Sequence, residues 1–188
     1  MENQDTRVQF TKNALKTALL DLLRKKPIAK VSVKELCQKA GLNRSTFYLH
    51  YGEPNDVLRE IEEETIERLL PGFNRYSAKS NDLNLLSSLF TAMLKEKELF
   101  LILMGNNGAP QFTERIKKRM WLEVKDVWHR EFPSYDMDKL KFVYDYVFAG
   151  SIQAQLEWIQ DGKDITTEQI ARRLDRLGHY CQLAIREF

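Results

Sequence analysis

Most hydrophobic residues of this chain recur at intervals of three and four positions, which is the spacing of one face of an α-helix. A first helix is predicted to end before Pro27, because proline cannot continue a regular helix. Its inward face carries Leu15, Ala18, Leu19, Leu22 and Leu23. Longer helices are predicted over approximate ranges of 55–70, 83–95, 98–104, 110–132, 137–160 and 167–186.

Two short helices are predicted between residues 32 and 50. Ser32 and Glu35 have the Ser-x-x-Glu spacing of a capping box, and Gly41 suits the residue that ends a helix. Asn43 suits the N-cap of the next helix, which is predicted from Arg44 to about residue 50. Farther along, Pro71-Gly72 predicts a helix end and the polar stretch 74–82 predicts a loop. The sequence therefore predicts an all-α protein of about nine helices.

The charge of the chain is unevenly distributed. Residues 1–52 contain ten Lys or Arg and four Asp or Glu, a net charge of +6, whereas the remaining 136 residues carry 19 basic and 23 acidic side chains, a net charge of −4. A basic N-terminal quarter on a slightly acidic body indicates a region that binds a polyanion. We therefore predict an N-terminal domain over 1–52 and a second domain over 53–188.

The second of the two short helices has an unusual composition. It gathers hydrogen-bond donors into less than two turns, and only Phe47 and Tyr51 form a pair that faces the core. Such a helix stabilises a fold poorly, but it suits the reading element of a helix-turn-helix, which enters the major groove of DNA. The candidate DNA-contacting residues are Ser32, Asn43, Arg44, Ser45, Thr46, Tyr48, Leu49 and His50.

Residues 33–51, Val-Lys-Glu-Leu-Cys-Gln-Lys-Ala-Gly-Leu-Asn-Arg-Ser-Thr-Phe-Tyr-Leu-His-Tyr, resemble the helix-turn-helix signature of the tetracycline-repressor (TetR) family, and the likeness extends over about 8–58. The resemblance implies a transcriptional regulator in which positions 43–46 approach bases and phosphates. It also implies that Tyr48, and often His50, bind phosphate. One position departs from the family pattern: Gly52-Glu-Pro-Asn-Asp56 contains no basic residue where the family commonly places a phosphate-binding lysine, and its two carboxylates would repel a close phosphate.

The C-terminal part is similar to a Firmicute-type branch of the same family over residues 99–112, 148–152 and 157–158. That branch contains repressors and co-activators, so the sign of regulation stays open. Family members usually hold an effector in this domain, and the resemblance implies a pocket for a small hydrophobic effector. The alternative is an ordinary hydrophobic core. The candidate pocket residues are Met93, Phe100, Met104, Phe112, Met120, Trp121 and Tyr146.

The last two helices are predicted to pair with their copies in a homodimer. A single short helix reads about half of a DNA site, and a two-fold dimer presents two such helices to successive major grooves. Small residues around Gly150 would allow close approach of the backbones, and apolar residues of the last helix follow a four-three-four spacing. The candidate interface residues are Gly150, Ile170, Leu174, Leu177 and Cys181.

Other classes of function fit the sequence less well. No paired acid and base, phosphate loop or metal-ligand spacing is present, so we expect neither an enzyme nor a cofactor or metal site. No apolar run is long enough to span a membrane, and two distant cysteines indicate a reducing cytoplasm. The remaining alternative is a helical protein-binding co-regulator or scaffold that keeps the fold but has lost DNA reading. Double-stranded DNA, a second copy and a small hydrophobic effector are the expected partners.

Overall fold

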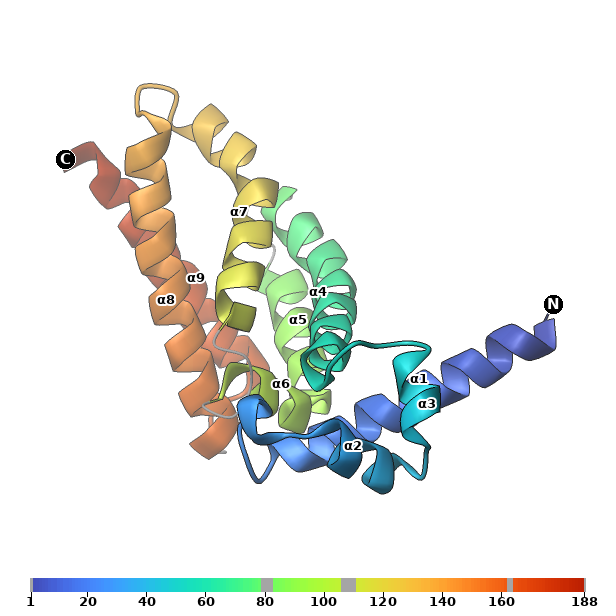
Figure 1. Ribbon diagram of the computed structural model, residues 1–188. Helices are drawn as coiled ribbons and strands as arrows, with labels where there is room; N and C mark the ends of the chain where they lie inside the picture. The colour runs from blue at the N-terminus through green and yellow to red at the C-terminus, as the bar shows by residue number, and fades with distance from the viewer. Residues whose placement is uncertain (1, 79–82, 106–110, 162–163, 188) are drawn as a thin grey trace. The chain divides into compact units, whose positions relative to one another are not determined.

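The computed structural model describes residues 2–78, 83–105, 111–161 and 164–187, which are helical almost throughout (Figure 1). Within those residues it contains nine α-helices and two short 3₁₀ helices and no strand, which confirms the predicted all-α class. The α-helices are α1 (Glu2–Leu23), α2 (Val33–Ala40), α3 (Arg44–Tyr48), α4 (Pro54–Ala78), α5 (Leu83–Lys95), α6 (Lys97–Met104), α7 (Gln111–Glu131), α8 (Met137–Asp161) and α9 (Thr167–Ala184). The 3₁₀ helices are η1 (Ile28–Lys30) and η2 (Ile185–Glu187).

The chain forms two compact units. The first contains residues 1–65 and 98–112, and the second contains residues 66–97 and 113–188. Helix α4 thus contributes its first half to one unit and its second half to the other. The units group residues by packing alone, and the functional boundary expected after residue 52 stays a prediction.

The core of the first unit is built on α1, which packs against α2. The five residues of the predicted inward face of α1 are all buried, as are Leu36 and Cys37 of α2. Phe47 and Tyr51 complete this core from α3 and the segment after it, with ring centroids 5.8 Å apart. The predicted Phe47–Tyr51 pair is therefore confirmed, and Cys37 occupies the place of a small hydrophobic residue.

The ends of α2 follow the prediction in part. The Ser32 hydroxyl accepts the backbone N–H of Glu35 at 3.2 Å, but the Glu35 carboxylate bonds the Lys26 ammonium and not the backbone of Ser32. Gly41 ends the helix in the left-handed conformation with φ 68°, as predicted. Asn43 stands at the N-cap position of α3, but its side chain makes no capping hydrogen bond.

Helix α4 is longer than the sequence predicted. It continues through Pro71 to Ala78, so the predicted end at Pro71-Gly72 and the first part of the predicted loop 74–82 are wrong; residues 79–82 lie outside the described residues. Proline removes only its own N–H from the helix ladder, so a long helix can continue past it at a cost of roughly 3 kcal/mol. Gly72 serves packing here, since an added Cβ would lie 3.3 Å from Cδ1 of Leu89 on α5.

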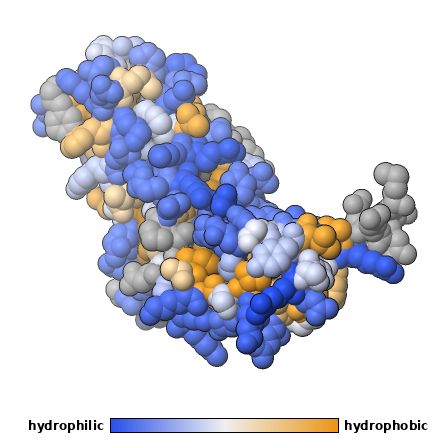
Figure 2. Space-filling view, viewed as in Figure 1, coloured by the Kyte–Doolittle hydropathy of each residue, from blue (hydrophilic) through white to orange (hydrophobic). Residues whose placement is uncertain are grey.

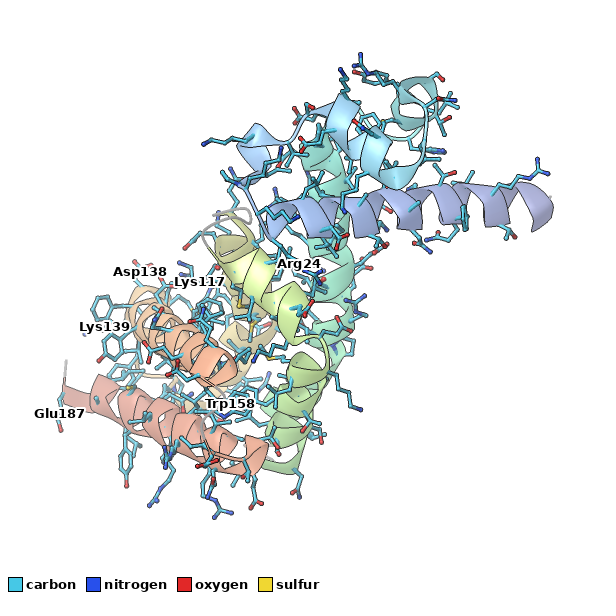
Figure 3. All side chains as sticks on the ribbon, turned by 90° about the horizontal axis from the view of Figure 1, so that it is seen from below. Arg24, Lys117, Asp138, Lys139, Trp158 and Glu187 are labelled. Carbon is cyan, nitrogen blue, oxygen red and sulfur yellow. The ribbon has the colours of Figure 1, made fainter. Side chains whose placement is uncertain are left out.

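The second unit places α9 against both α5 and α8. Helix α9 begins with a complete capping box, in which the Thr166 hydroxyl accepts the N–H of Gln169 and the Gln169 side chain accepts the N–H of Thr166. The Trp158 indole of α8, labelled in Figure 3, donates to the carbonyl of Ile165 at 2.8 Å. An added Cβ at Gly178 would lie 3.5 Å from Val147, an ordinary van der Waals distance, so α9 and α8 are in contact at this position.

Aromatic side chains join α7 to α8 in the second unit. The ring of Tyr144 lies 5.0 Å from that of Trp121, 6.0 Å from that of Trp128 and 5.9 Å from that of Phe148. The Tyr144 hydroxyl donates to the carbonyl of Lys117 at 2.7 Å, which satisfies its polar atom within this cluster. Trp128 is buried in this cluster, whereas Trp121 is half-buried.

The turn before α3 offers a test of the backbone at Gly41. We predict that Gly41→Ala destabilises the fold by about 1–2 kcal/mol, because a left-handed conformation strains any residue with a Cβ. No heavy atom lies within 4 Å of the added Cβ, so the loss would come from the backbone alone. Urea unfolding of the two proteins would measure it. Gly41→Asn should recover part of the loss, because asparagine tolerates this conformation, and equal losses for both variants would contradict the explanation.

Candidate nucleic-acid interface

Helix α3 buries a single side chain. Phe47 is fully buried, whereas the other residues of the predicted contact set on and around α3 are exposed or half-buried. Tyr48 is 59% exposed and Leu49 is 80% exposed, unusually high values for large apolar side chains. The structure therefore brings Asn43, Arg44, Ser45, Thr46, Tyr48, Leu49 and His50 together on one short element, while Ser32 lies exposed at the start of α2.

The base of α3 is fixed by aromatic packing. The ring of Phe47 meets that of Tyr48 edge-on at 5.4 Å and also packs on Tyr51. The amide of Asn43, which makes no capping bond, is exposed at the start of the same helix. The element thus combines a rigid inner side with an outer side of donors, acceptors and one leucine, the groups that contact base edges in a major groove.

The ten basic residues of 1–52 fall into two equal groups. Five form ion pairs with carboxylates of the first unit: Lys12, Lys16, Arg24, Lys26 and Lys39. Five are exposed and form no ion pair within hydrogen-bonding reach in the part of the chain that the structure describes: Arg7, Lys25, Lys30, Lys34 and Arg44. Composition alone could not separate the groups. Half of the basic side chains of this region are therefore paired with carboxylates in the folded chain.

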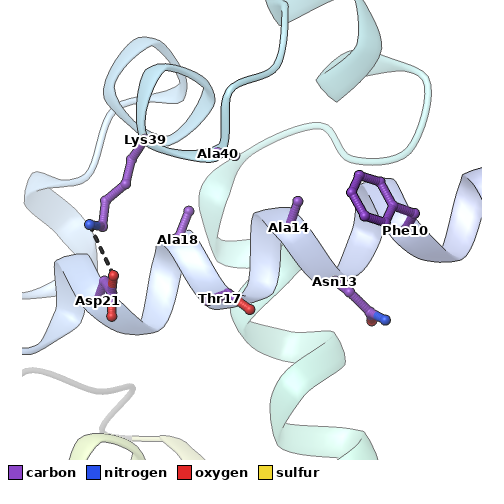
Figure 4. A pocket seen from close by; sticks show the side chains of 8 residues that line it. All are labelled: Phe10, Asn13, Ala14, Thr17, Ala18, Asp21, Lys39 and Ala40. Atoms are coloured by element: carbon purple, nitrogen blue, oxygen red, sulfur yellow. Dashed lines mark ion pairs between the residues drawn. The ribbon is translucent and has the colours of Figure 1, made fainter.

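A pocket of about 340 Å³ lies between α1 and α2 in the first unit (Figure 4). The ion pair between Lys39 of α2 and Asp21 of α1, 2.9 Å long, closes one side of it. The hydrogen bond from Lys39 holds the pKa of Asp21 below its ordinary value. None of the predicted effector residues lines this pocket. It is lined by Phe10, Asn13, Ala14, Thr17, Ala18, Asp21, Lys39 and Ala40.

The start of α4, where the family places a basic residue, is closed by its own carboxylate. Oδ2 of Asp56 accepts the backbone N–H groups of Gly52 at 2.9 Å and Glu53 at 3.0 Å, and Oδ1 pairs with Arg59 at 3.0 Å. Backbone donors that could otherwise bind a phosphate are therefore occupied. The expected repulsion from Asp56 is partly offset by Arg59, but the departure from the family pattern is real.

A polar network joins α1, α4 and the segment after α3. Glu60 of α4 accepts from Lys12 at 3.1 Å, from Lys16 at 2.8 Å and from the Tyr51 hydroxyl at 2.9 Å. Lys16 also pairs with Glu64 at 2.6 Å. The sequence analysis missed this network, because lysines every four residues on α1 resemble a solvated face.

The network shifts the pKa values of its members. Burial alone would raise the pKa of Glu60, but the hydrogen bonds from Lys16, Tyr51 and Lys12 lower it overall. Burial would lower the pKa of Lys16, but the two carboxylates raise it overall. Burial and the bond to Glu60 together raise the pKa of Tyr51. Glu62, two residues from both Glu60 and Glu64, is also buried, so the acidic run of α4 is only in part a solvated face.

The predicted effector residues are divided between the two units. Phe100, Met104 and Phe112 belong to the first, and Met93, Met120, Trp121 and Tyr146 belong to the second. Phe100, Phe112 and Met93 are buried, whereas Tyr146 is 69% exposed on α8. The predicted pocket stays a prediction, and Tyr146 is placed on the surface of its unit.

The predicted interface residues are also divided. Ile170 and Leu174 are buried inside the chain, because that side of α9 packs against α5 and α8. Leu177 is 62% exposed, Gly150 is exposed and Cys181 is half-buried. Helix periodicity identified the apolar side of α9 but could not tell a buried side from a side left for a partner.

The described residues show two further features. They contain no cluster of three or more His, Cys, Asp or Glu side chains that could hold a metal ion. No helix among them is long and apolar enough to cross a membrane, and the face in Figure 2 is mostly hydrophilic with separate hydrophobic patches.

Comparison with known proteins identifies the architecture. A TetR family model described as a transcriptional regulator C-terminal region matches residues 81–180, more than half of the chain. The chain belongs to the TetR family of transcriptional regulators. This family membership accounts for both parts of the molecule: the helix-turn-helix of the first unit and the helical C-terminal region.

Individual proteins resemble this chain in sequence or in fold. The HTH-type transcriptional regulator YxbF of Bacillus subtilis is 28% identical over 107 residues, which are 56% of this chain and 26% of YxbF. A TetR transcriptional regulator from Streptococcus agalactiae has the same fold, with a TM-score of 0.72 at 19% identity over 94% of this chain and 98% of the other. The fatty acid degradation regulator FadR of Bacillus halodurans gives a TM-score of 0.62 at 13% identity over 89% and 93% of the two chains.

The Glu60 network predicts a pH dependence of stability. Because the folded pKa of Glu60 lies below its ordinary value of 4.5, its contribution is present above that pH and is lost as the pH falls through the folded pKa. The contribution of Lys16, whose pKa is raised, is lost only above its ordinary value of 10.5. Urea unfolding at pH 7 and pH 4 should show a smaller acid loss for Glu60→Gln than for the wild type. An unchanged acid loss would contradict this role.

Proposed function

We propose that this TetR-family regulator binds a palindromic operator as a homodimer, with α3 of each subunit in a major groove. The observation that carries the proposal is that Phe47 is the one buried side chain of α3, whereas Thr46 is half-buried and the other three are exposed. A helix of five residues with so little buried surface adds little to the fold, but it suits base reading.

Residue roles follow from chemistry and exposure. Arg44 can donate in bidentate fashion to guanine, and Leu49 can contact a thymine methyl group. Tyr48, with its exposed hydroxyl, and His50 suit phosphate contacts. Lys34, one residue inside α2, and Lys30 of η1 supply positive charge that the start of α4 lacks. The further candidates for base or backbone contacts are Ser32, Asn43, Ser45 and Thr46.

A second copy would cover the exposed apolar face of the second unit. Phe142 and Tyr146 of α8 and Leu177 and Tyr180 of α9 are each more than 60% exposed, although they are large and apolar. Gly150 lies on the same helix as the first two and has no heavy atom within 4 Å of an added Cβ. Packing these side chains against their two-fold copies would place two α3 helices on one duplex, as an operator with half-sites about 34–36 Å apart requires.

A small hydrophobic effector is the remaining part of the proposal. The second unit is rich in aromatic and methionine side chains, and the structurally similar FadR is a regulator of fatty acid degradation. An effector changes DNA binding only if it binds one arrangement of the protein better than the other. Operator titrations with and without candidate apolar compounds would test this part independently of DNA binding itself.

If α3 reads DNA, a variant that loses a base contact should behave differently from one that loses a phosphate contact. Arg44→Ala should weaken operator binding by about 1–3 kcal/mol more than binding to random DNA, because a guanine contact carries sequence information. Tyr48→Phe should weaken both equally, because a phosphate contact does not. Fluorescence anisotropy with both duplexes would measure these affinities.

Salt dependence tests the phosphate contacts, and selection from genomic fragments tests sequence reading. Contacts to roughly 6–10 phosphates per dimer imply that wild-type affinity falls by about 10³–10⁵ between 50 and 200 mM salt. If selection from genomic fragments enriches no palindrome, the reading proposal fails and the protein-binding scaffold becomes the better function.

Dimerisation predicts a strong effect of charge at Gly150. An arginine at this position fits the isolated chain, but in a symmetric interface each subunit would bury an unpaired charge against its copy. Gly150→Arg should therefore give a folded monomer in light scattering, with weakened operator binding. Leu122→Arg, at an exposed apolar residue of α7, is the matched control and should remain dimeric. A dimeric Gly150→Arg protein would place the interface elsewhere.

A further inference from the structure

We propose that Glu60 is a positioning residue for DNA reading, which sets the orientation of α3 through the hydroxyl of Tyr51. This inference rests on the proposed DNA-binding function. Glu60 does not belong to the set of residues that approach DNA. It lies on α4 and receives donors from two other parts of the first unit.

Four contacts make Glu60 the centre of the network. Its two carboxylate oxygens accept from Lys12 and Lys16 of α1 and from Tyr51, at distances between 2.8 and 3.2 Å. The Lys12 ammonium also lies 5.6 Å from the centroid of the Tyr51 ring. The network therefore holds Tyr51 by its hydroxyl and by its ring face, and it connects three segments that are distant in sequence.

Tyr51 transmits this restraint to the recognition helix. Its backbone N–H bonds the carbonyl of Phe47, and its ring packs on that of Phe47, the single buried residue of α3. Tyr48 precedes Tyr51 by three residues. A rotation of the Tyr51 ring about its own backbone would therefore shift the support of Phe47, and the exposed face of α3 would turn with it.

The charges of the network indicate that it orients α3 and does not attract DNA. Two lysines face two carboxylates, Glu60 and Glu64, so the group carries no net charge. The Lys16 side chain is only 10% exposed, which leaves its ammonium unavailable to a phosphate. Lys12 and Lys16 therefore add to the basic count of the N-terminal region without adding to its attraction for DNA.

This arrangement predicts a separation between affinity and specificity. Glu60→Gln keeps the side-chain size but removes the negative charge. Lys12 and Lys16 then face one carboxylate fewer, so the first unit becomes more positive. We expect operator affinity to fall by about 10-fold or more, whereas affinity for random DNA stays the same or rises slightly. Tyr51→Phe should lower the operator-to-random ratio in the same direction, because it removes the bond and keeps the ring.

Two controls separate positioning from a general effect of lost charge or lost stability, and a third tests whether Lys12 contacts phosphate. Glu63→Gln removes an exposed carboxylate of the same helix, and Ile159→Val weakens the core of the second unit. Both should leave the operator-to-random ratio within 2-fold of the wild type, even where Ile159→Val lowers Tm as much as Glu60→Gln does. Lys12→Met should leave the salt slope unchanged, whereas loss of a phosphate-binding lysine from both subunits of the dimer would reduce it by about 1.8, or about 0.9 per contact.

The outcomes are distinguishable from a failure of the proposed function. If the wild type shows no operator preference, DNA reading itself is wrong. If the wild type prefers its operator and Glu60→Gln keeps the same ratio, Glu60 does not position α3. A salt slope that falls by about 1.8 in the Lys12→Met dimer, or about 0.9 per subunit, would also overturn the inference, because Lys12 would then contact phosphate directly.

Discussion

The first unit depends on one constraint: a five-residue helix must hold a fixed orientation while burying a single side chain. One and a half turns cannot be stable alone, because nucleation of a helix costs more than so few hydrogen bonds return. Phe47 supplies the anchor from inside, and Gly41 sets the angle at which the chain enters α3. The other side chains of α3 then do not have to pack in the core. This division explains how seven neighbouring residues, five of them exposed and two half-buried, can stay out of the core without loss of the fold.

Charge in the N-terminal region serves two purposes that composition cannot separate. Half of the basic residues lock α1, α2 and α4 together, and the other half stay exposed and form no ion pair within hydrogen-bonding reach among the described residues. Exposed ion pairs contribute little each, but Lys16 is largely buried and bonds two carboxylates, so its pairs are screened less by water. The same residue type therefore provides rigidity at position 16 and, in our proposal, long-range attraction at position 34.

Local signals predicted much of the fold, and long-range packing accounts for what they missed. The apolar spacing of α1, the cap at Ser32, the left-handed Gly41 and the bounds of α5 could all be predicted, because each depends on residues within a few positions. Pro71-Gly72 predicted a helix end, but α4 continues through both residues. Gly72 lies where α5 approaches α4, a contact between separate helices that the local sequence does not reveal. At Asn43 the sequence predicted a capping side chain, but the residue stands at the N-cap position with its amide exposed and makes no capping bond.

The same distinction applies to the candidate site. The α3 residues could be identified because they are contiguous and match a family signature, and none of them needs a distant partner. Glu60 could not, since its role arises only when Lys12, Lys16 and Tyr51 reach it from other segments. Ile170 and Leu174 show the converse: a regular apolar seam indicates burial but not what covers it, and α5 and α8 of the same chain cover this one. An interface with a second copy is better sought among large apolar side chains that the fold leaves exposed. Phe142, Tyr146, Leu177 and Tyr180 meet that criterion on adjacent helices, and this is why the proposed dimer face rests on exposure and not on periodicity.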